Sequence, residues 1–182
     1  MTGCIIGDIA GSAYEFSGNK DPNVDLFPPD ADITDDTLLV IATCEVLLNG
    51  GSYGVSYKMM AQFFPDPKGG YGARFNAWAK SNDMKPYQSW GNGSAMRAGP
   101  IGIAKDALNT VLDEAKRSAE VTHNHPEGIK GAQATAAAVF LAKHGSSKSE
   151  IREFVEANFG YALRRSIESI RKDYRFDESC QG

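Results

Sequence analysis

The sequence has few cysteines, no long apolar run and no excess of basic residues, and each shortage excludes a class of protein. Its three cysteines are far apart and outside any Cys-x-x-Cys spacing, which predicts reduced thiols rather than disulfides or a zinc site: Cys4, Cys44 and Cys180. The longest apolar run, within residues 38–48, is too short to span a bilayer. Residues 1–13 lack the basic start of a signal peptide. We therefore expect a cytoplasmic protein that does not enter a membrane.

Basic side chains are too few for binding to a polyanion. The chain has 19 Lys and Arg against 23 Asp and Glu, and this net charge of -4 argues against a sequence-independent grip on nucleic acid or anionic lipid. Its 182 residues, 42% of them hydrophobic, suffice for one ordinary domain over residues 1–182 without disulfides or metals. Alternating β-branched runs, which are typical of strands, are almost absent.

Apolar residues spaced three and four apart predict an all-α protein instead. Ser147 and Glu150 have the spacing of a capping box. The alanine-rich segment 132–142 carries little bulk, so we expect a central helix that its neighbours approach closely. The predicted helices cover residues 36–49, 57–64, 106–121, 126–144 and 151–157, and a last one is marked by Leu163, Ile167, Ile170 and Tyr174.

Two passages in the first forty residues combine small and acidic residues. In residues 7–15, two glycines four apart suit close helix packing, and Glu15 follows with a single negative charge. Residues 32–37 place Asp35 and Asp36 at the start of an expected helix, next to Thr34. Capping and the helix dipole explain these acids as well as a hard cation does, namely Mg²⁺, Mn²⁺ or Ca²⁺, which prefers oxygen ligands. Both explanations stay open on spacing alone.

Two later passages carry polar groups that suit an anion. The Gly-Asn-Gly turn at residues 91–93, followed by Ser94 as a candidate helix cap, either presents backbone N–H groups to a phosphate or is an ordinary turn. His123 and His125 form a His-x-His pattern before Pro126, but no further soft ligand has a recognisable spacing for zinc. Hydrogen bonding at the head of the following helix is the favoured role for these histidines.

Taken together and in this order, four stretches resemble the ADP-ribosylglycohydrolase family, which includes the dinitrogenase-reductase-activating glycohydrolases. They read GDIAGSAYEF, DITDDT, GNGSAMR and THNHPEG, and the closing SCQG resembles a family stretch that leads into further helices. The resemblance implies an all-α, compact multi-helix orthogonal bundle. It also implies a Mg²⁺-dependent hydrolase that cleaves the anomeric glycosidic bond between ADP-ribose and a modified side chain or small acceptor.

The resemblance assigns roles to individual residues. Four of them match the family's first metal-binding motif and an acidic residue near the metals: Thr34, Asp35, Asp36 and Glu15. Of these, Glu15 and Asp35 are the candidates for catalytic proton transfer, and the sequence does not decide between them. Another four fall where the family's cleft contacts the diphosphate and ribose of its ligand: Asn92, Gly93, Ser94 and His123.

One part of the family pattern is missing. Members carry a second acidic motif, Asp-x-Asp-Thr, which completes two Mg²⁺ sites, and this sequence has none; Asp177 and Glu178 stand in a different context. The resemblance thus implies an incomplete domain, about the first two thirds, with one ion or weak binding, acting as a homo-oligomer or with a complementing C-terminal fragment. Two functions stay open: a hydrolase of ADP-ribosylated proteins or small ADP-ribose conjugates, and a non-catalytic truncated remnant that binds ADP-ribose weakly or only folds and oligomerises.

Overall fold

The computed structural model describes residues 1–175 and 177–181, so Gly182 of the SCQG stretch lies outside the described residues. In that part of the chain the protein is built of α-helices and one short 3-10 turn, without strands, which confirms the all-α prediction. The elements in chain order are α1 (Thr2–Ser12), α2 (Asp35–Asn49), α3 (Tyr53–Phe63), α4 (Ala73–Lys80), η1 (Asn92–Ser94), α5 (Gly99–Ala104), α6 (Leu108–Glu120), α7 (Pro126–Lys143), α8 (Lys148–Phe159) and α9 (Ile167–Asp173).

Capping side chains explain where several helices begin. Thr34 caps α2 by accepting a hydrogen bond from the Asp36 backbone N–H, which leaves Asp35 and Asp36 in the first turn. The predicted capping box of Ser147 and Glu150 opens α8. Pro126 occupies the first turn of α7, as the sequence predicted.

Three helices were not predicted, and the last predicted one is shorter than expected. The helix α1 contains three glycines, and α4 and α5 have only eight and six residues, so their apolar periodicity is too short or too weak to recognise. The helix α9 begins at Ile167, one residue after its cap Ser166, and therefore excludes Leu163. Ser94 was expected to cap a helix but ends the η1 turn instead, and its hydroxyl donates to the Gly128 carbonyl.

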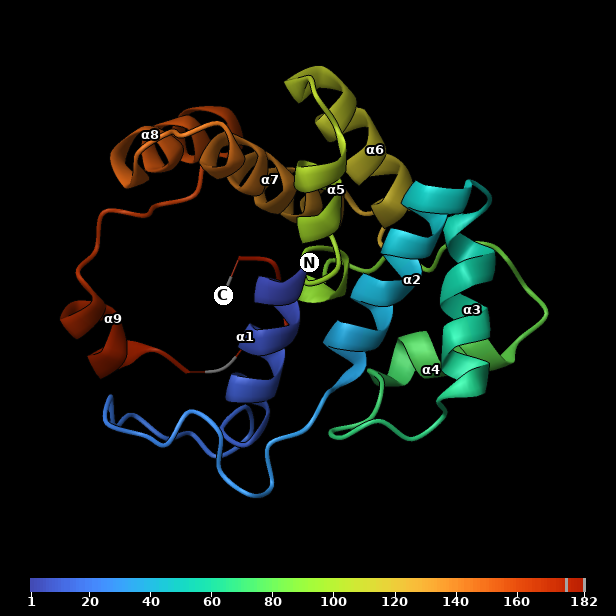
Figure 1. Ribbon diagram of the computed structural model, residues 1–182, viewed down its shortest axis with the longest axis horizontal. Helices are drawn as coiled ribbons and strands as arrows, with labels where there is room; N and C mark the ends of the chain where they lie inside the picture. The colour runs from blue at the N-terminus through green and yellow to red at the C-terminus, as the bar shows by residue number, and fades with distance from the viewer. Residues whose placement is uncertain (176, 182) are drawn as a thin grey trace.

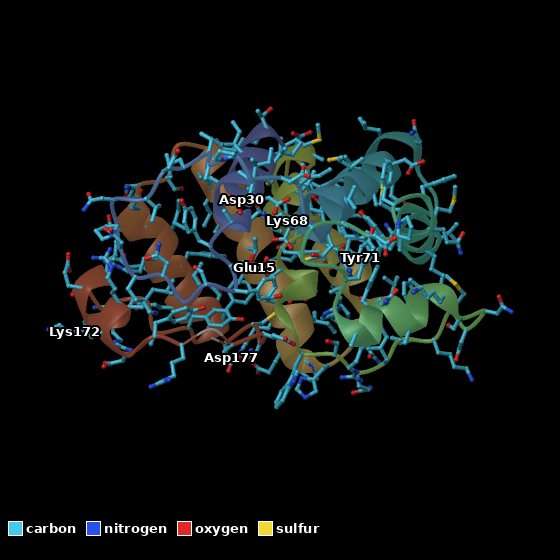
Figure 2. The ribbon with its side chains drawn as sticks, turned by 90° about the horizontal axis from the view of Figure 1, so that it is seen from below. Glu15, Asp30, Lys68, Tyr71, Lys172 and Asp177 are labelled. Carbon is cyan, nitrogen blue, oxygen red and sulfur yellow. The ribbon has the colours of Figure 1, made fainter. Side chains whose placement is uncertain are left out.

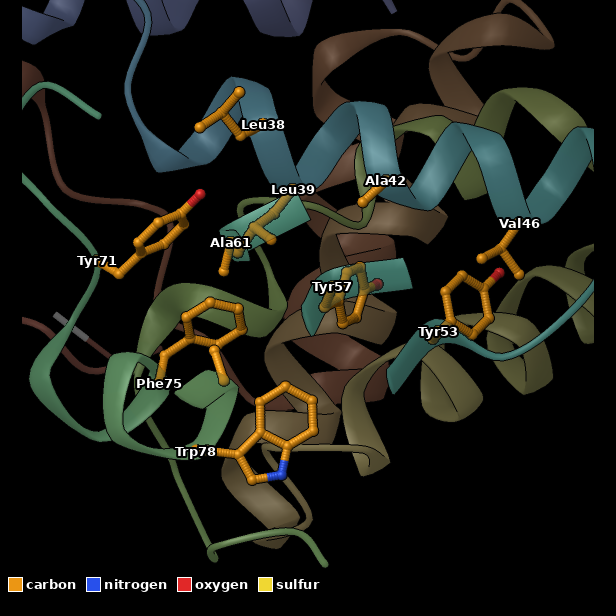
Figure 3. Packing of buried hydrophobic residues seen from close by; sticks show 11 residues of the cluster. Leu38, Leu39, Ala42, Val46, Tyr53, Tyr57, Ala61, Tyr71, Phe75 and Trp78 are labelled. Carbon is orange, nitrogen blue, oxygen red and sulfur yellow. The ribbon is translucent and has the colours of Figure 1, made fainter. Parts of the chain in front are cut away.

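The helices pack around two apolar clusters. In the first, aromatic side chains of α3 and α4 lie under the buried face of α2, as Figure 3 shows for Tyr57, Phe75 and Trp78 beneath Leu39. The second joins α5, α6 and α7 (Figure 1) through the fully buried Ala132, Ala136 and other small residues. This confirms that the alanine-rich segment is a closely surrounded helix.

Close packing in the second cluster depends on one glycine. A Cβ atom on Gly102 of α5 would lie 2.3 Å from the carbonyl oxygen of Ala136 and 2.9 Å from the backbone nitrogen of Phe140, both in α7. Only a residue without a side chain lets the two backbones approach so closely. The α5–α7 contact in turn fixes where the η1 turn sits, because η1 precedes α5 by four residues and also packs on α7.

The helices α1 and α9 are the least covered. In α1 only Ser12 is buried, Ile6 is 50% exposed, and a Cβ atom added at Gly3 or Gly7 would meet nothing within 4 Å. No residue of α9 is buried, and it stands apart from the other helices in Figure 1. None of the helices in the described ranges is long and apolar enough to cross a membrane.

Candidate functional site

Most of the predicted site residues line one cleft of about 420 Å³. Its walls come from the turn after α1, the start of α2, the loop before α4 with the first turn of that helix, the η1 turn and the segment before α7. Six predicted residues line it: Glu15, Asp35, Asp36, Asn92, Gly93 and His123. The two others, Thr34 and Ser94, are buried behind its walls. The four sequence passages therefore meet in space, although up to a hundred residues separate them.

The acidic end of the cleft is organised by Asp8 of α1. Its carboxylate accepts hydrogen bonds from the Thr34 backbone N–H (2.9 Å), the Thr34 hydroxyl (2.6 Å) and the Thr37 backbone N–H (3.1 Å). These bonds fix the first turn of α2 against α1, so that Asp35 and Asp36 face the cleft. The sequence analysis assigned no role to Asp8, although a charge inside an apolar helix was the available signal.

A glycine-containing loop covers the same end. Thr34 forms an isolated parallel bridge with Lys68, and Gly69 follows with a positive φ of 77°. A Cβ atom on Gly69 would lie 3.2 Å from the Phe16 ring and 3.9 Å from Glu15 Oε2. Figure 2 labels Glu15 near Lys68 and Tyr71, which lie at the two ends of this loop. The loop thus narrows the cleft above the Glu15 carboxylate.

Among the described residues, the carboxylates of Asp8, Glu15, Asp35 and Asp36 have no cationic partner, because every ion pair there involves other side chains. Burial, followed by the charges of Asp36 and Glu15, raises the pKa of Asp35 to about 7. Burial, followed by Asp8 and Glu15, raises the pKa of Asp36 to about 6. Burial and then Asp8 raise the pKa of Glu15.

The donor set suits a hard cation in kind, but it is not a finished site. Carboxylate and hydroxyl oxygens are the ligands that Mg²⁺ prefers, and repulsion among unpaired acids is relieved by a dication. Thr34 Oγ1 already donates to Asp8 and accepts from the Asp36 N–H, which leaves it one lone pair. Within residues 1–175 and 177–181, no three His, Cys, Asp or Glu side chains converge to hold a metal. Further oxygen ligands are therefore needed.

The η1 turn forms the opposite end of the cleft. The Asn92 backbone N–H donates to the Glu178 carbonyl (2.8 Å), so it is not available to a ligand. Gly93 is the second residue of a 3-10 turn, a position whose N–H has no acceptor within the turn. The Ser94 side chain is fully buried and donates to the Gly128 carbonyl (2.7 Å). Gly93 is thus the residue of this turn best placed to donate to a ligand.

Residues 177–181 pack along this turn. Ser179 forms an isolated antiparallel bridge with Gly91, and the Cys180 N–H donates to the Trp90 carbonyl (3.1 Å). Glu178 lines the cleft near Gly91 and not at the acidic end, so it does not replace the missing acidic motif. This agrees with the sequence argument that its context differs.

His123 lies behind the η1 turn and is 5% exposed. Its Nδ1 is 2.8 Å from the Thr122 hydroxyl, and a Cβ atom on Gly93 would lie 3.1 Å from its Nε2. Burial, followed by the charges of Arg97 and Arg74, lowers the pKa of His123 to about 3, so the ring is neutral. The second histidine, His125, accepts from the Glu127 N–H as the cap of α7. His125 therefore has the predicted hydrogen-bonding role at the head of α7, whereas the ring of His123 bonds to Thr122, which precedes that helix.

Two arginines that the sequence analysis left without a role give the cleft a positive end. Arg97 is fully buried and its guanidinium carbon lies 4.0 Å from the centre of the Tyr57 ring. Arg74 lies over the Tyr87 ring and donates to the Tyr87 carbonyl. Both arginines line the cleft, whereas Glu15, Asp35 and Asp36 line its other end and Asp8 lies behind it. The cleft is therefore acidic at the α2 end, while the η1 end carries two arginines and a single acid, Glu178.

Comparison with known proteins agrees with the motifs. A family model described as ADP-ribosylglycohydrolase matches residues 1–179. The chain is similar to ADP-ribosylhydrolase ARH3 of Bos taurus, with 29% identity over an alignment of 194 residues. The alignment covers 88% of this chain and 53% of that protein. It is also similar to the protein of that name from Homo sapiens, with 29% identity over 82% of this chain and 50% of that protein. The protein of that name from Mus musculus is 28% identical over 88% of this chain and 52% of that protein.

The extent of these matches fixes what they establish. The chain spans about half the length of the curated relatives it matches. The family model, in contrast, covers nearly the whole chain and includes all the passages that build the cleft. The match, the all-α architecture and the convergence of the motifs on one cleft show that the chain belongs to the ADP-ribosylglycohydrolase family.

Proposed function

We propose that this cleft takes part in the Mg²⁺-dependent removal of ADP-ribose from modified side chains or small acceptors. The observation that carries the proposal is the group of unpaired carboxylates at one end of a cleft whose other end carries two arginines against one acid, Glu178. ADP-ribose has a matching polarity, because its distal ribose is neutral and its diphosphate is anionic. Binding in this direction brings the anomeric carbon to the acids.

The residues that would hold the metal are Glu15, Thr34, Asp35 and Asp36. Their oxygen chemistry fits Mg²⁺, and Asp8 stabilises the turn that carries three of them. When bound, the ion supplies charge stabilisation and orientation of the ribose hydroxyls and of a water. The ligands that an Asp-x-Asp-Thr segment supplies in the family would come from a complementing segment, because a second copy of this chain carries no such motif either.

The carboxylates also suit the chemistry of glycosidic hydrolysis. The water oxygen bonds to the anomeric carbon as the bond from that carbon to the acceptor breaks, and the ring passes through a state with positive charge. Negative charge from Asp35 and Asp36 stabilises that state. Asp35 or Glu15 accepts the proton that the water loses, and the departing side chain takes up a proton from the other of these two carboxyls in its protonated form.

The diphosphate would lie at the opposite end. Gly93 offers a backbone N–H, the neutral His123 offers a ring nitrogen, and Asn92 contributes its exposed side chain at the rim. Arg74 adds positive charge beside them. The substrate class is therefore an ADP-ribosylated protein or a small ADP-ribose conjugate, with arginine or serine as candidate acceptors. The three free cysteines suit the reducing cytoplasm, which we propose as the location.

Release of free ADP-ribose tests the activity. The chain is incubated with ADP-ribosyl-arginine and ADP-ribosyl-serine peptides, with and without Mg²⁺, alone and with a peptide that bears an Asp-x-Asp-Thr segment. We expect release only with Mg²⁺, and loss of it in Asp35→Ala plus Asp36→Ala. The matched control is Asp32→Ala, which removes a nearby exposed carboxylate. Absence of release in every condition would refute hydrolysis.

A second function, non-catalytic binding of ADP-ribose, is favoured by one observation, the lack of three convergent metal ligands among the described residues. Titration calorimetry separates the two. The hydrolase proposal predicts weak binding of one Mg²⁺ ion that the double Asp35 and Asp36 variant abolishes. Binding of ADP-ribose without any Mg²⁺ binding would favour the non-catalytic function. Submicromolar binding of two ions by this chain alone would contradict the view that ligands are missing.

A further inference from the structure

A buried chain of hydrogen bonds connects the arginine of the GNGSAMR motif to the cleft histidine. The Nη2 group of Arg97 donates to Thr122 Oγ1 at 2.7 Å and to the Ser118 carbonyl at 3.2 Å. Thr122 Oγ1 is in turn 2.8 Å from Nδ1 of His123. Arg97 and Thr122 are fully buried and His123 is nearly so, which means that solvent does not compete for these hydrogen bonds. The proposed function uses His123 but leaves Arg97 and Thr122 unexplained.

Counting the protons fixes the direction of the Arg97 bond and leaves the threonine proton for a second bond. A guanidinium has only donors, so Thr122 Oγ1 must be the acceptor of the Arg97 bond. The threonine hydroxyl keeps its single proton and is free to donate it. Its partner at 2.8 Å is Nδ1, which accepts only when that nitrogen carries no proton. A neutral imidazole then carries its proton on Nε2.

Tyr87 competes with His123 for the threonine proton. Its hydroxyl is close enough to the threonine to affect the tyrosine pKa, and its ring lies 6.0 Å from the His123 ring. Burial is the main influence and raises the pKa of Tyr87, so this hydroxyl is protonated and can donate to Thr122. An oxygen with two lone pairs accommodates donors from both Arg97 and Tyr87. The threonine proton is therefore left for His123.

The opposite edge of the imidazole faces the η1 turn. Cβ atoms built on Gly91 and Gly93 would lie 3.7 and 3.1 Å from His123 Nε2, so any larger residue at Gly93 would crowd that nitrogen. Gly91, Gly93 and His123 all line the cleft. Nε2 is thus the imidazole atom closest to the place where an oxygen of a ligand would lie.

We propose that Arg97 and Thr122 are positioning residues that hold His123 in the neutral tautomer protonated at Nε2, so that this N–H donates to an anionic oxygen in the cleft. The tautomer is a property of the ligand-free protein, whereas its use on a diphosphate oxygen rests on the proposed function. A neutral ring that only donates is specific for an acceptor, and it needs no change of charge when the ligand binds.

Nitrogen NMR of the ligand-free protein tests the tautomer. The chain has three histidines, so a ¹⁵N-histidine sample gives few signals, and His123→Gln assigns those of interest. We expect a protonated, pyrrole-type Nε2 and an unprotonated, pyridine-type Nδ1 at neutral pH. Thr122→Ser keeps the hydroxyl and this pattern, whereas Thr122→Val, of nearly the same shape, moves the signals toward the other tautomer. A proton on Nδ1 in the unaltered protein, or an unchanged pattern in Thr122→Val, would overturn the proposal.

Binding of ADP-ribose separates this proposal from the proposed function. Affinity is expected to fall about tenfold in Thr122→Val and to stay the same in Thr122→Ser, because an acceptor oxygen then faces an Nε2 that often lacks its proton. If the tautomer shifts in Thr122→Val and the affinity does not, the donor role is wrong. If the unaltered chain shows the expected tautomer but binds no ADP-ribose, the proposed function fails while the assignment of Arg97 and Thr122 stands.

Discussion

Replacing Asp35 with asparagine should make the metal-free protein more stable at pH 8. Burial and the charges of Asp36 and Glu15 raise the pKa of Asp35 from 3.8 to about 7, so its charged form is disfavoured in the folded state. An acid whose pKa is raised on folding costs no stability below pH 3.8, and the cost is fully present above pH 7. Asparagine has nearly the same shape and carries no charge.

The magnitude follows from the size of this rise. At about 1.4 kcal/mol per pKa unit, a rise from 3.8 to about 7 sets a ceiling of about 4 kcal/mol for the cost of the charge. Asp35 occupies the first turn of α2, where the helix dipole favours a negative charge by about 0.3–1 kcal/mol. Partial solvent access and the linked protonation of Asp36 reduce the cost further. We expect a net gain of about 1–2 kcal/mol, or about 2–8 °C in Tm.

Thermal unfolding at pH 4.5 and pH 8, with and without Mg²⁺, provides the assay. Asp35→Asn should unfold at a higher temperature than the unaltered protein at pH 8 without Mg²⁺, and the difference should shrink at pH 4.5. Added Mg²⁺ should stabilise the unaltered protein but not the variant, since the variant lacks a proposed ligand. Asp32→Asn, which changes an exposed acid three residues earlier, serves as the control.

Two results would refute the reasoning. If Asp35→Asn is no more stable than the unaltered protein at pH 8, the carboxylate is not held against repulsion in the folded state. If Mg²⁺ stabilises Asp35→Asn as much as the unaltered protein, Asp35 is not a ligand. The two outcomes are independent, because the first concerns the electrostatics of the ligand-free fold and the second concerns the ion.

Three further predictions concern stability. Gly102→Ala should lose about 1–3 kcal/mol in chemical denaturation, because its Cβ would clash with the α7 backbone, whereas Gly3→Ala, with open space around it, should not destabilise. Asp8→Ala should lose about 1–3 kcal/mol because three donors lose their acceptor; unchanged stability would contradict its structural role. The fold lowers the pKa of His123 to about 3, so the stability that its neutral ring contributes is present above pH 6.5 and is lost as the pH falls toward 3. In His123→Gln this loss of stability should be smaller, as measured by denaturation between pH 3 and pH 6.5.

The parts of the fold that could be predicted from the sequence are those governed by local chemistry. The start of α2 at Thr34, the capping box of α8 and the proline in the first turn of α7 each depend on side chains within four residues of a helix end. The helix α1 was not predicted, because glycine disfavours helix on local criteria. Its place is determined instead by Asp8, which bonds to the first turn of α2 from 26 residues away.

The candidate site also has residues that could be found from the sequence and residues whose roles depend on distant partners. Residue types and motif order placed Asp35, Gly93 and His123 in one candidate site, and all three line the cleft. The role of Ser94 was misjudged, because its partner is the Gly128 carbonyl, 34 residues away. Arg97 was inside a recognised motif, yet nothing in the sequence indicates that its guanidinium reaches Thr122. Long-range partners decide whether a motif residue faces the ligand or supports one that does.

Asp8 differs from Asp35 and Asp36 in how its charge is compensated, and this difference shows how the chain combines a stable fold with a strained site. Asp8 accepts three hydrogen bonds from α2, so its charge is compensated by donors within the protein. Asp35 and Asp36 occupy the helix start that these bonds create, but they face the cleft, and burial and repulsion raise the pKa of each. Under the proposed function, the repulsion among these groups would contribute to the binding of a cation or of a positively charged sugar ring between them. Stability at Asp8 and strain at Asp35 and Asp36 are therefore two parts of one arrangement.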